Sequence, residues 1–138
     1  MPVQLKALKT KETDFEPRTL GEHIKKRRLL LGLYQREVAE GLGVDDFTVH
    51  NWEKGKTEPP IRVIPTILTF LGYNPFPVPE TLSERMLAAR RLKGWPVLEA
   101  GRAVGIDGST WVRWEHRGRI PWRRYRLKIE TLLADLGL

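Results

Sequence analysis

Cysteine is absent from the 138 residues of this chain. Its absence excludes disulfide bonds, cysteine-ligated zinc, iron–sulfur clusters and a thiol nucleophile. Histidine is also scarce: His23, His50 and His116 lie far apart, and none stands in a metal-ligand spacing such as H-E-x-x-H. The sequence shows no nucleophile–base pair and no phosphate-binding loop. We therefore expect no metal, no cofactor and no enzymatic activity.

Long apolar runs are missing too. No stretch approaches the roughly 20 apolar residues that span a bilayer. The N-terminus lacks the apolar core of a signal peptide. These absences predict a cytoplasmic protein without a membrane partner.

Positive charge is the main bias of the composition. Lysine and arginine outnumber acidic residues by 24 to 17, which gives a net charge of +7 and a pI of about 10.0. Most of the excess of positive charge lies in residues 80–138, which contain 12 basic and 7 acidic residues. A small basic chain without a membrane helix has nucleic acid as its leading partner class.

The sequence repeats itself at an offset of 62 residues without a gap. The recurring positions include Thr19 and Thr81, Arg28 and Arg90, Gly43 and Gly105, Trp52 and Trp114, and Glu53 and Glu115. Chance produces few identities at any one offset. We interpret the chain as two copies of one unit.

Each unit has the signals of short helices. Thr19 with Glu22, and Thr81 with Glu84, match the capping box that starts a helix, and glycines mark helix ends. The expected helices run from Thr19 to Gly32, Gln35 to Gly43, Asp45 to Gly55 and about 64–71, then in the same order in the second unit up to a last helix at about 123–134. The spacing places these apolar side chains in the core: Leu20, Ile24, Leu31, Val38, Leu42, Val49, Trp52, Trp111, Trp114, Leu127, Leu132 and Leu133.

The expected fold is all-α, with two tandem units. Residues 1–18 are predicted to be a mobile arm, 19–73 the first unit, 74–80 a proline-rich linker and 81–138 the second unit. Entry of Lys6, Lys9 and Lys11 of the arm into a DNA minor groove is one alternative to a purely solvated arm.

Residues 33–55, LYQREVAEGLGVDDFTVHNWEKG, resemble the helix-turn-helix of lambda-repressor/Cro-like (Xre-type) DNA-binding regulators. The resemblance covers residues 19–72 well. Residues 81–134 match less closely but keep the skeleton G-I-D-x-S-T-W-V-R-W-E at 105–115. It implies that the third helix of a unit enters the major groove of double-stranded DNA, and that the chain is a prokaryotic or phage transcriptional regulator.

The resemblance also implies roles for individual residues. The positions that face bases are Asp46, Phe47, His50, Asn51, Ser109 and Arg113. The positions expected on the phosphate side are Gln35, Thr48, Lys54, Lys56, Thr110, Arg117 and Arg119. Arg28 with Glu53, and Arg90 with Glu115, match a buried ion pair that ties the first helix to the recognition helix.

The second unit departs from the pattern. Val97 replaces Gln35 and Pro96 replaces Tyr34, whereas Arg113 replaces Asn51 and supplies a good reader of guanine. A protein-interaction module, similar to an antitoxin that docks a partner, stays an alternative because the first recognition helix offers Phe47 beside Asp45 and Asp46. A homodimer and a protein partner for the second unit also stay open.

Overall fold

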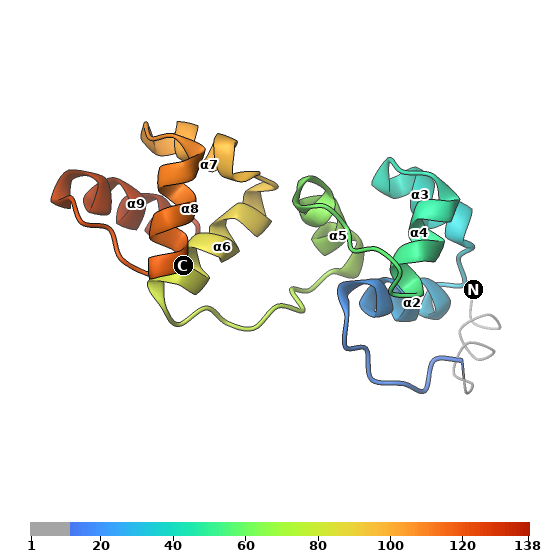
Figure 1. The fold of residues 1–138 in the computed structure, drawn as a ribbon. Helices are drawn as coiled ribbons and strands as arrows, with labels where there is room; N and C mark the ends of the chain where they lie inside the picture. The colour runs from blue at the N-terminus through green and yellow to red at the C-terminus, as the bar shows by residue number, and fades with distance from the viewer. Residues whose placement is uncertain (1–11) are drawn as a thin grey trace. The chain divides into compact units, whose positions relative to one another are not determined.

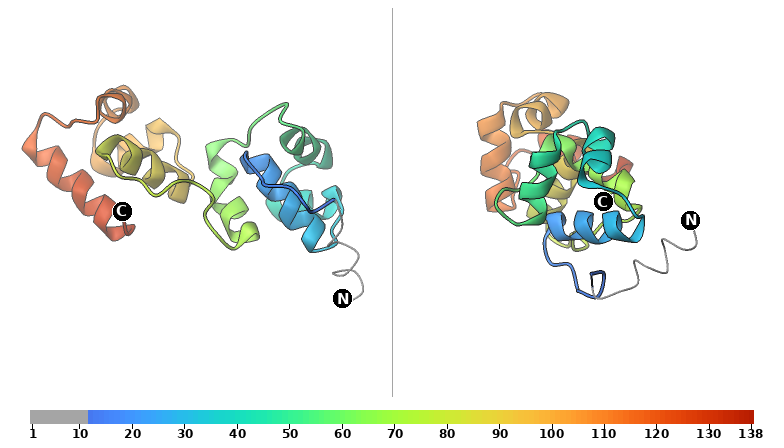
Figure 2. Two further views of the ribbon diagram at one scale, coloured as in Figure 1. Left: turned by 90° about the horizontal axis from the view of Figure 1, so that it is seen from below. Right: turned by 90° about the vertical axis from the view of Figure 1, so that its right-hand side faces the viewer.

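The computed structural model describes residues 12–138 (Figures 1 and 2). It contains eight α-helices and one short 3₁₀ helix, and no strand occurs within this range. The all-helical expectation is therefore confirmed. No helix in the described part of the chain is both long and apolar enough to cross a membrane. Lys6, Lys9 and Lys11 of the predicted arm lie outside the described residues.

The chain divides into two compact units, the first ending at Pro75 and the second running from Phe76 to Leu138. The helices of the first unit are α2 (Leu20–Leu30), α3 (Gln35–Leu42), α4 (Asp46–Glu53), η1 (Ile61–Val63) and α5 (Ile64–Leu71). Those of the second are α6 (Leu82–Lys93), α7 (Val97–Val104), α8 (Gly108–Arg117) and α9 (Arg123–Asp135). All predicted helices form within a few residues of their expected bounds.

Side-chain caps start the first helix of each unit. The Thr19 hydroxyl accepts a hydrogen bond from the Glu22 backbone N–H at 3.1 Å, and the Glu22 carboxylate accepts one from the Thr19 N–H at 3.3 Å. Thr81 and Glu84 make the same reciprocal bonds at 3.1 and 3.0 Å. These bonds satisfy N–H groups that have no partner inside the helix, so α2 and α6 begin where the sequence predicts.

Each unit has its own apolar core. In the first unit α4 packs against α2 and α3, and in the second α8 packs against α6 and α7 (Figure 1). The first core consists of Ile24, Val38, Ala39, Leu42, Val49, Trp52, Ile67 and Leu71. The second consists of Met86, Ala89, Ala100, Val104, Trp111, Trp114, Ile120, Ile129 and Leu133. The three tryptophans that were assigned to the core are buried there.

The prediction that Leu31 and Leu127 lie in the core is wrong. Leu31 is 41% exposed because it follows the last residue of α2, where the chain turns away at Gly32 with φ +70°. Leu127 is 55% exposed. It stands two positions before Ile129, which is buried, and two residues rotate about 200° around a helix. Leu127 therefore lies on the opposite face of α9.

The predicted arm is partly in contact with the first unit. The Nζ of Lys26 donates to the backbone carbonyl of Phe15 at 2.8 Å, and lies 5.6 Å from the centre of the Phe15 ring. Thr13 is buried. Residues 12–18, which the sequence assigned to a mobile arm, thus lie against α2.

Candidate nucleic-acid interface

The two helices predicted to be recognition helices, α4 and α8, each begin after an aspartate cap. The Oδ1 of Asp45 accepts hydrogen bonds from the backbone N–H of Thr48 at 2.8 Å and from its hydroxyl at 2.7 Å. In the second unit, Asp107 Oδ1 accepts from the Thr110 N–H at 2.7 Å and from the Ser109 hydroxyl at 2.8 Å. The Thr48 and Thr110 side-chain hydrogen bonds are the main cause that lowers the pKa of Asp45 and Asp107, respectively.

These caps restrict what two predicted contact residues can do. The hydroxyl hydrogens of Thr48 and Ser109 both point to a capping carboxylate. A hydroxyl that donates to one acceptor can only accept at its remaining positions. Thr48 must rotate before it can donate to a phosphate, whereas Ser109 is ready to accept from a base amino group.

A buried ion pair joins α2 to α4 in the first unit and α6 to α8 in the second. Arg28 Nε lies 2.7 Å from Glu53 Oε2, and Arg28 Nη2 lies 2.9 Å from Glu53 Oε1. Both equivalent distances between Arg90 and Glu115 are 2.9 Å. The side chains of Glu53 and Glu115 are 3% and 9% exposed. The two arginines also donate to backbone carbonyls, at Leu33 and Trp95.

A third donor completes each pair, and it differs between the units. In the first unit Gln35 Nε2 donates to Glu53 Oε1 at 3.1 Å. In the second unit Val97 stands in place of Gln35, and the buried indole Nε1 of Trp111 donates to Glu115 Oε1 at 3.1 Å. Because a glutamine amide nitrogen has two N–H groups, Gln35 keeps one for the predicted phosphate contact.

The exposed face of α4 is aromatic and acidic. Phe47 is 66% exposed and its ring stacks on that of His50, with centroids 6.0 Å apart and an interplanar angle of 13°. Asp46 is exposed beside them. The expectation that His50 and Asn51 are exposed is wrong: both are half-buried, and Oδ1 of Asn51 is covered without a hydrogen-bond partner in the described chain. The Lys56 N–H bonds to the Asn51 carbonyl at 2.9 Å, so the loop after α4 lies against this turn.

The exposed face of α8 is basic. Arg113, at the position equivalent to Asn51, is exposed, as is Ser109. Of the predicted phosphate-side residues, Lys54, Lys56, Arg117 and Arg119 are exposed, and Thr48 and Thr110 are half-buried. Arginine can make two parallel hydrogen bonds to a guanine edge, so the exposure of Arg113 is compatible with the predicted contact to a base.

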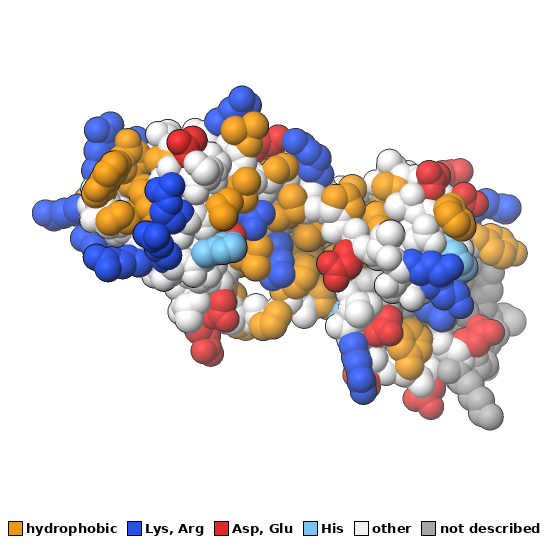
Figure 3. All heavy atoms as spheres, viewed as in Figure 1, with side chains coloured by type: hydrophobic (Ala, Val, Ile, Leu, Met, Phe, Trp, Pro, Cys, Tyr) orange, Lys and Arg blue, Asp and Glu red, His pale blue; other side chains and the backbone are white. Residues whose placement is uncertain are grey.

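The basic residues of the second unit gather around the end of α8. We name as the arginine patch the exposed side chains Arg113, Arg117, Arg119, Arg123, Arg124 and Arg126. On the face shown in Figure 3, lysine and arginine side chains gather over the region of α8 and α9. The first turn of α9 holds no acidic residue. Basic side chains there oppose the helix dipole, which is an arrangement suited to binding an anion rather than to stabilising the helix.

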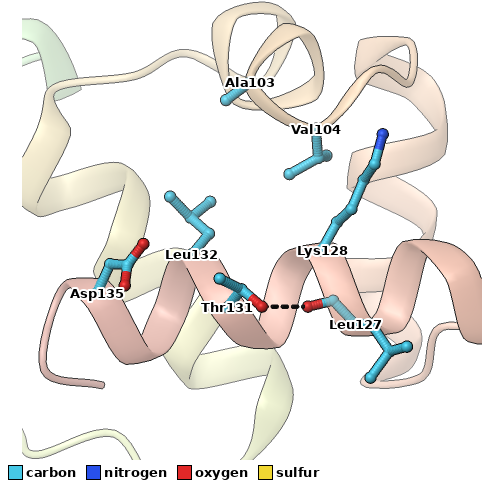
Figure 4. A pocket seen from close by; sticks show the side chains of 7 residues that line it. All are labelled: Ala103, Val104, Leu127, Lys128, Thr131, Leu132 and Asp135. Atoms are coloured by element: carbon cyan, nitrogen blue, oxygen red, sulfur yellow. Dashed lines mark hydrogen bonds between the residues drawn. The ribbon is translucent and has the colours of Figure 1, made fainter.

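Two hollows mark the second unit. One, of about 330 Å³, lies between the start of α8 and the loop that leads to α9. The other, of about 480 Å³, lies between α7 and α9 and is shown in Figure 4. Its lining is largely apolar, with Lys128 and Asp135 at the α9 wall. No three acidic or histidine side chains within residues 12–138 gather closely enough to hold a metal ion.

Sequence reasoning missed Trp122 and Tyr125, which line the smaller hollow. The signal was present as the run P-W-R-R-Y at 121–125, shortly after α8. Aromatic residues interleaved with arginines are a feature of surfaces that bind nucleic acid.

Comparison with known protein families finds a helix-turn-helix match in the first unit. Residues 24–77 match the helix-turn-helix family model HTH_3, which represents the Xre and lambda-repressor type. The matched region begins within α2 and includes α3, α4 and α5. No curated protein and no solved structure matches the chain. Residues 24–77 of the first unit are therefore similar to a helix-turn-helix family.

Proposed function

We propose that this protein binds double-stranded DNA in a sequence-specific manner and acts as a transcriptional regulator of the prokaryotic or phage type. The observation that carries the proposal is the α3–turn–α4 arrangement in the region that matches the helix-turn-helix family. In this arrangement the second helix enters the major groove and offers its side chains to base edges. On the first unit these side chains are Asp46 and Phe47, which are exposed, and His50 and Asn51, which are half-buried.

We also propose that the second unit is a diverged copy of the first, joined to it by the proline-rich segment 74–80. The support is a set of matching details at an offset of 62 residues: the helix caps, the buried ion pairs and the aspartates that start α4 and α8. In this copy Arg113 reads a guanine, and Arg117 and Arg119 hold phosphates. The arginine patch gives the second unit the larger share of salt-dependent affinity.

Selection of bound sequences from a random pool of duplexes tests the proposal with the full chain. We expect enrichment of one defined site, and an affinity that falls steeply as salt rises. Recovery of an unenriched pool, or binding that does not respond to salt, would contradict it. Arg119→Ala should reduce affinity for every duplex and lower the salt dependence by about one ion.

A second candidate is a protein-interaction role for the first unit. It is favoured by Phe47, which is 66% exposed and stands beside Asp45 and Asp46. Acidic side chains at the start of a recognition helix repel phosphates, and an exposed aromatic side chain is a frequent anchor at protein interfaces. If Phe47→Ala leaves the DNA affinity and site unchanged, this candidate is preferred for α4.

We propose that two copies of the chain associate through α9, along the hollow shown in Figure 4. Lys128 and Asp135 stand seven residues apart, which places them on one side of the helix and about 10 Å apart along it. An antiparallel two-fold pairing of α9 brings each Lys128 to the Asp135 of a second copy, around Leu127, Thr131 and Leu132. We propose this surface for self-association because the charge pattern is complementary to itself.

Charge exchange tests the pairing. Lys128→Asp and Asp135→Lys should each give monomers in sedimentation equilibrium, whereas an equimolar mixture of the two variants, and the double variant, should again form dimers. A wild-type chain that stays monomeric at the highest soluble concentration would rule the dimer out. DNA binding by the first unit does not depend on this result.

A further inference from the structure

The smaller hollow of the second unit combines exposed aromatic rings with a pair of opposite charges. Its volume of about 330 Å³ lies within the range of small-ligand sites. The lining side chains that matter here are Asp107 and Arg113, from the α8 side, and Trp122 and Tyr125, from the loop and the start of α9. Base reading by an α-helix in the major groove does not require such a hollow.

The aromatic wall is held in place by the core. Trp122 is 63% exposed, and its ring lies 5.9 Å from that of Tyr125 at an interplanar angle of 40°. Tyr125 in turn lies 5.9 Å from Trp114, which is buried. The guanidinium carbon of Arg124 lies 5.5 Å from the centre of the Tyr125 ring. An exposed indole that is anchored through a neighbour and surrounded by arginines is a platform on which a nucleobase can stack.

The charged wall supplies both a hydrogen-bond acceptor and a donor. The hydrogen bonds from the Ser109 hydroxyl and the Thr110 N–H both go to Oδ1 of Asp107, and a carboxylate has about four lone-pair sites, so it retains capacity to accept from a ligand. Hydrogen bonding by the Thr110 side chain, then by the Thr110 N–H and Ser109, lowers the pKa of Asp107, so the carboxylate is ionised at neutral pH. Arg113 offers a planar guanidinium on the same hollow.

These charges select the kind of ligand. A carboxylate in the lining disfavours a phosphate, and the surrounding arginine patch disfavours a cation. What remains is an uncharged, planar group that has donors and acceptors side by side. Among the nucleobases, guanine fits best: its N1–H and amino group suit a carboxylate, and its O6 and N7 suit an arginine. Adenine has a single donor group, its amino group, and no ring N–H beside it, so it cannot give a carboxylate two parallel hydrogen bonds.

We propose that this hollow holds one unstacked guanine of a DNA strand, with its ring against Trp122 and its edge between Asp107 and Arg113. The inference rests on the proposed function in one respect, since it takes DNA as the ligand. It adds that the second unit recognises a guanine that is outside the base stack, as in a single strand, an opened duplex or a frayed end.

Full-length protein and three labelled 12-nucleotide strands test the proposal by fluorescence anisotropy. One strand contains only thymine, and the other two carry a single central guanine or adenine. The guanine strand should bind about tenfold more tightly than the other two, which is within the discrimination that paired hydrogen bonds to a base edge provide. Trp122→Ala should remove this difference, because without the stacking platform the base no longer stays in the hollow. Arg113→Lys retains the charge but loses the two parallel hydrogen bonds. It should lower the guanine preference and leave thymine binding unchanged.

Two control variants test whether the guanine preference depends on an aromatic ring at position 122 rather than on any exposed aromatic side chain. Trp122→Phe retains an aromatic platform and should keep most of the preference. Tyr34→Ala removes a side chain that is 66% exposed and lies beside Arg36, in the first unit, and should leave the preference unchanged. Thermal unfolding followed by circular dichroism confirms that each variant is folded.

The outcomes separate this inference from the proposed function. Equal binding of the three strands, or a guanine preference that survives Trp122→Ala, overturns the inference. A duplex from the selected pool is titrated in parallel. If the duplex binds and the guanine preference is absent, only the inference fails. If the preference is present and no duplex binds, the inference stands and the proposed function fails.

Discussion

Trp111 donates its indole N–H to the carboxylate of Glu115 at 3.1 Å, within the core of the second unit. The same carboxylate receives two hydrogen bonds from Arg90. In the first unit Gln35 supplies the third bond, from a different helix and to the equivalent Glu53. A buried carboxylate requires several donors, because each unsatisfied lone pair costs free energy in a low-dielectric interior. The exchange of donors explains how the second unit tolerates Val97.

The first prediction concerns these ion pairs. Glu53→Ala leaves the Arg28 guanidinium without its partner, and we expect the free energy of unfolding to fall by about 3–5 kcal/mol, the cost of leaving a buried charge unpaired. Urea unfolding followed by circular dichroism measures it. Glu40→Ala, an exposed carboxylate on α3, is the matched control and should change stability by less than about 0.5 kcal/mol. Equal stabilities of the two variants would show that the pair contributes nothing.

The second prediction uses the close contact between α2 and α4. A Cβ atom on Gly21 would lie 1.9 Å from the carbonyl oxygen of Trp52, which is backbone and cannot move away without displacing the helix. Gly21→Ala should therefore destabilise the first unit by more than about 1 kcal/mol. Gly41→Ala is the opposite case, because nothing lies within 4 Å of its Cβ position in α3. It should stabilise the unit by roughly 0.5–1 kcal/mol. If both variants shift the unfolding midpoint in the same direction, the packing argument is wrong.

The third prediction is a pH dependence from His23. Its Nδ1 lies 2.7 Å from the Tyr73 hydroxyl, and burial, the largest cause, lowers its pKa below the usual 6.5. The unfolded chain then binds a proton more readily than the folded one. The stability that this difference provides is complete above pH 6.5 and is lost as the pH falls from 6.5 through the lowered pKa. Unfolding midpoints measured between pH 8 and pH 5 should decline less in His23→Gln, and an identical decline would contradict the assignment.

Local signals in the sequence were sufficient for the helices. Capping boxes at Thr19 and Thr81 and glycines after the helices depend on bonds within a few residues, so they are visible in sequence. Tertiary relationships were not visible. The covered Oδ1 of Asn51 could not be predicted, because it depends on which atoms pack around the end of α4. The Trp111 bond joins two residues of α8 that stand four positions apart, but the direction of the indole toward Glu115 depends on the packing of the core. Asn51 belongs to the candidate interface, and Trp111 belongs to the core of the second unit.

The fourth prediction separates base reading from phosphate binding in the second unit. Arg113 is exposed on α8, and Arg117 is exposed at the last residue of the same helix. Arg113→Ala should reduce affinity for the best duplex by about 1–3 kcal/mol and relax the preference at one base pair. Arg117→Ala should weaken binding to all duplexes alike. A uniform loss with Arg113→Ala would identify that residue as a phosphate contact.

The last prediction follows from the difference between the two recognition helices. Asp46, Phe47, His50 and the partly covered Asn51 on α4 correspond to Gly108, Ser109, Val112 and Arg113 on α8. Because side chains at these positions determine which base edges are read, two identical half-sites cannot satisfy both helices of one chain. We expect one chain to protect an asymmetric site made of two dissimilar segments. A dimer should protect a longer palindrome built from that asymmetric site.

Footprinting of the full chain on its selected duplex measures the protected segments. Arg113→Ala should weaken protection of one segment and leave the other in place, and His50→Ala should have the opposite effect, since His50 lies on α4. Protection of a single segment that neither variant alters would contradict the asymmetric site. Both variants change exposed or half-buried side chains outside the two cores, so a loss of protection reports on contact with DNA rather than on unfolding.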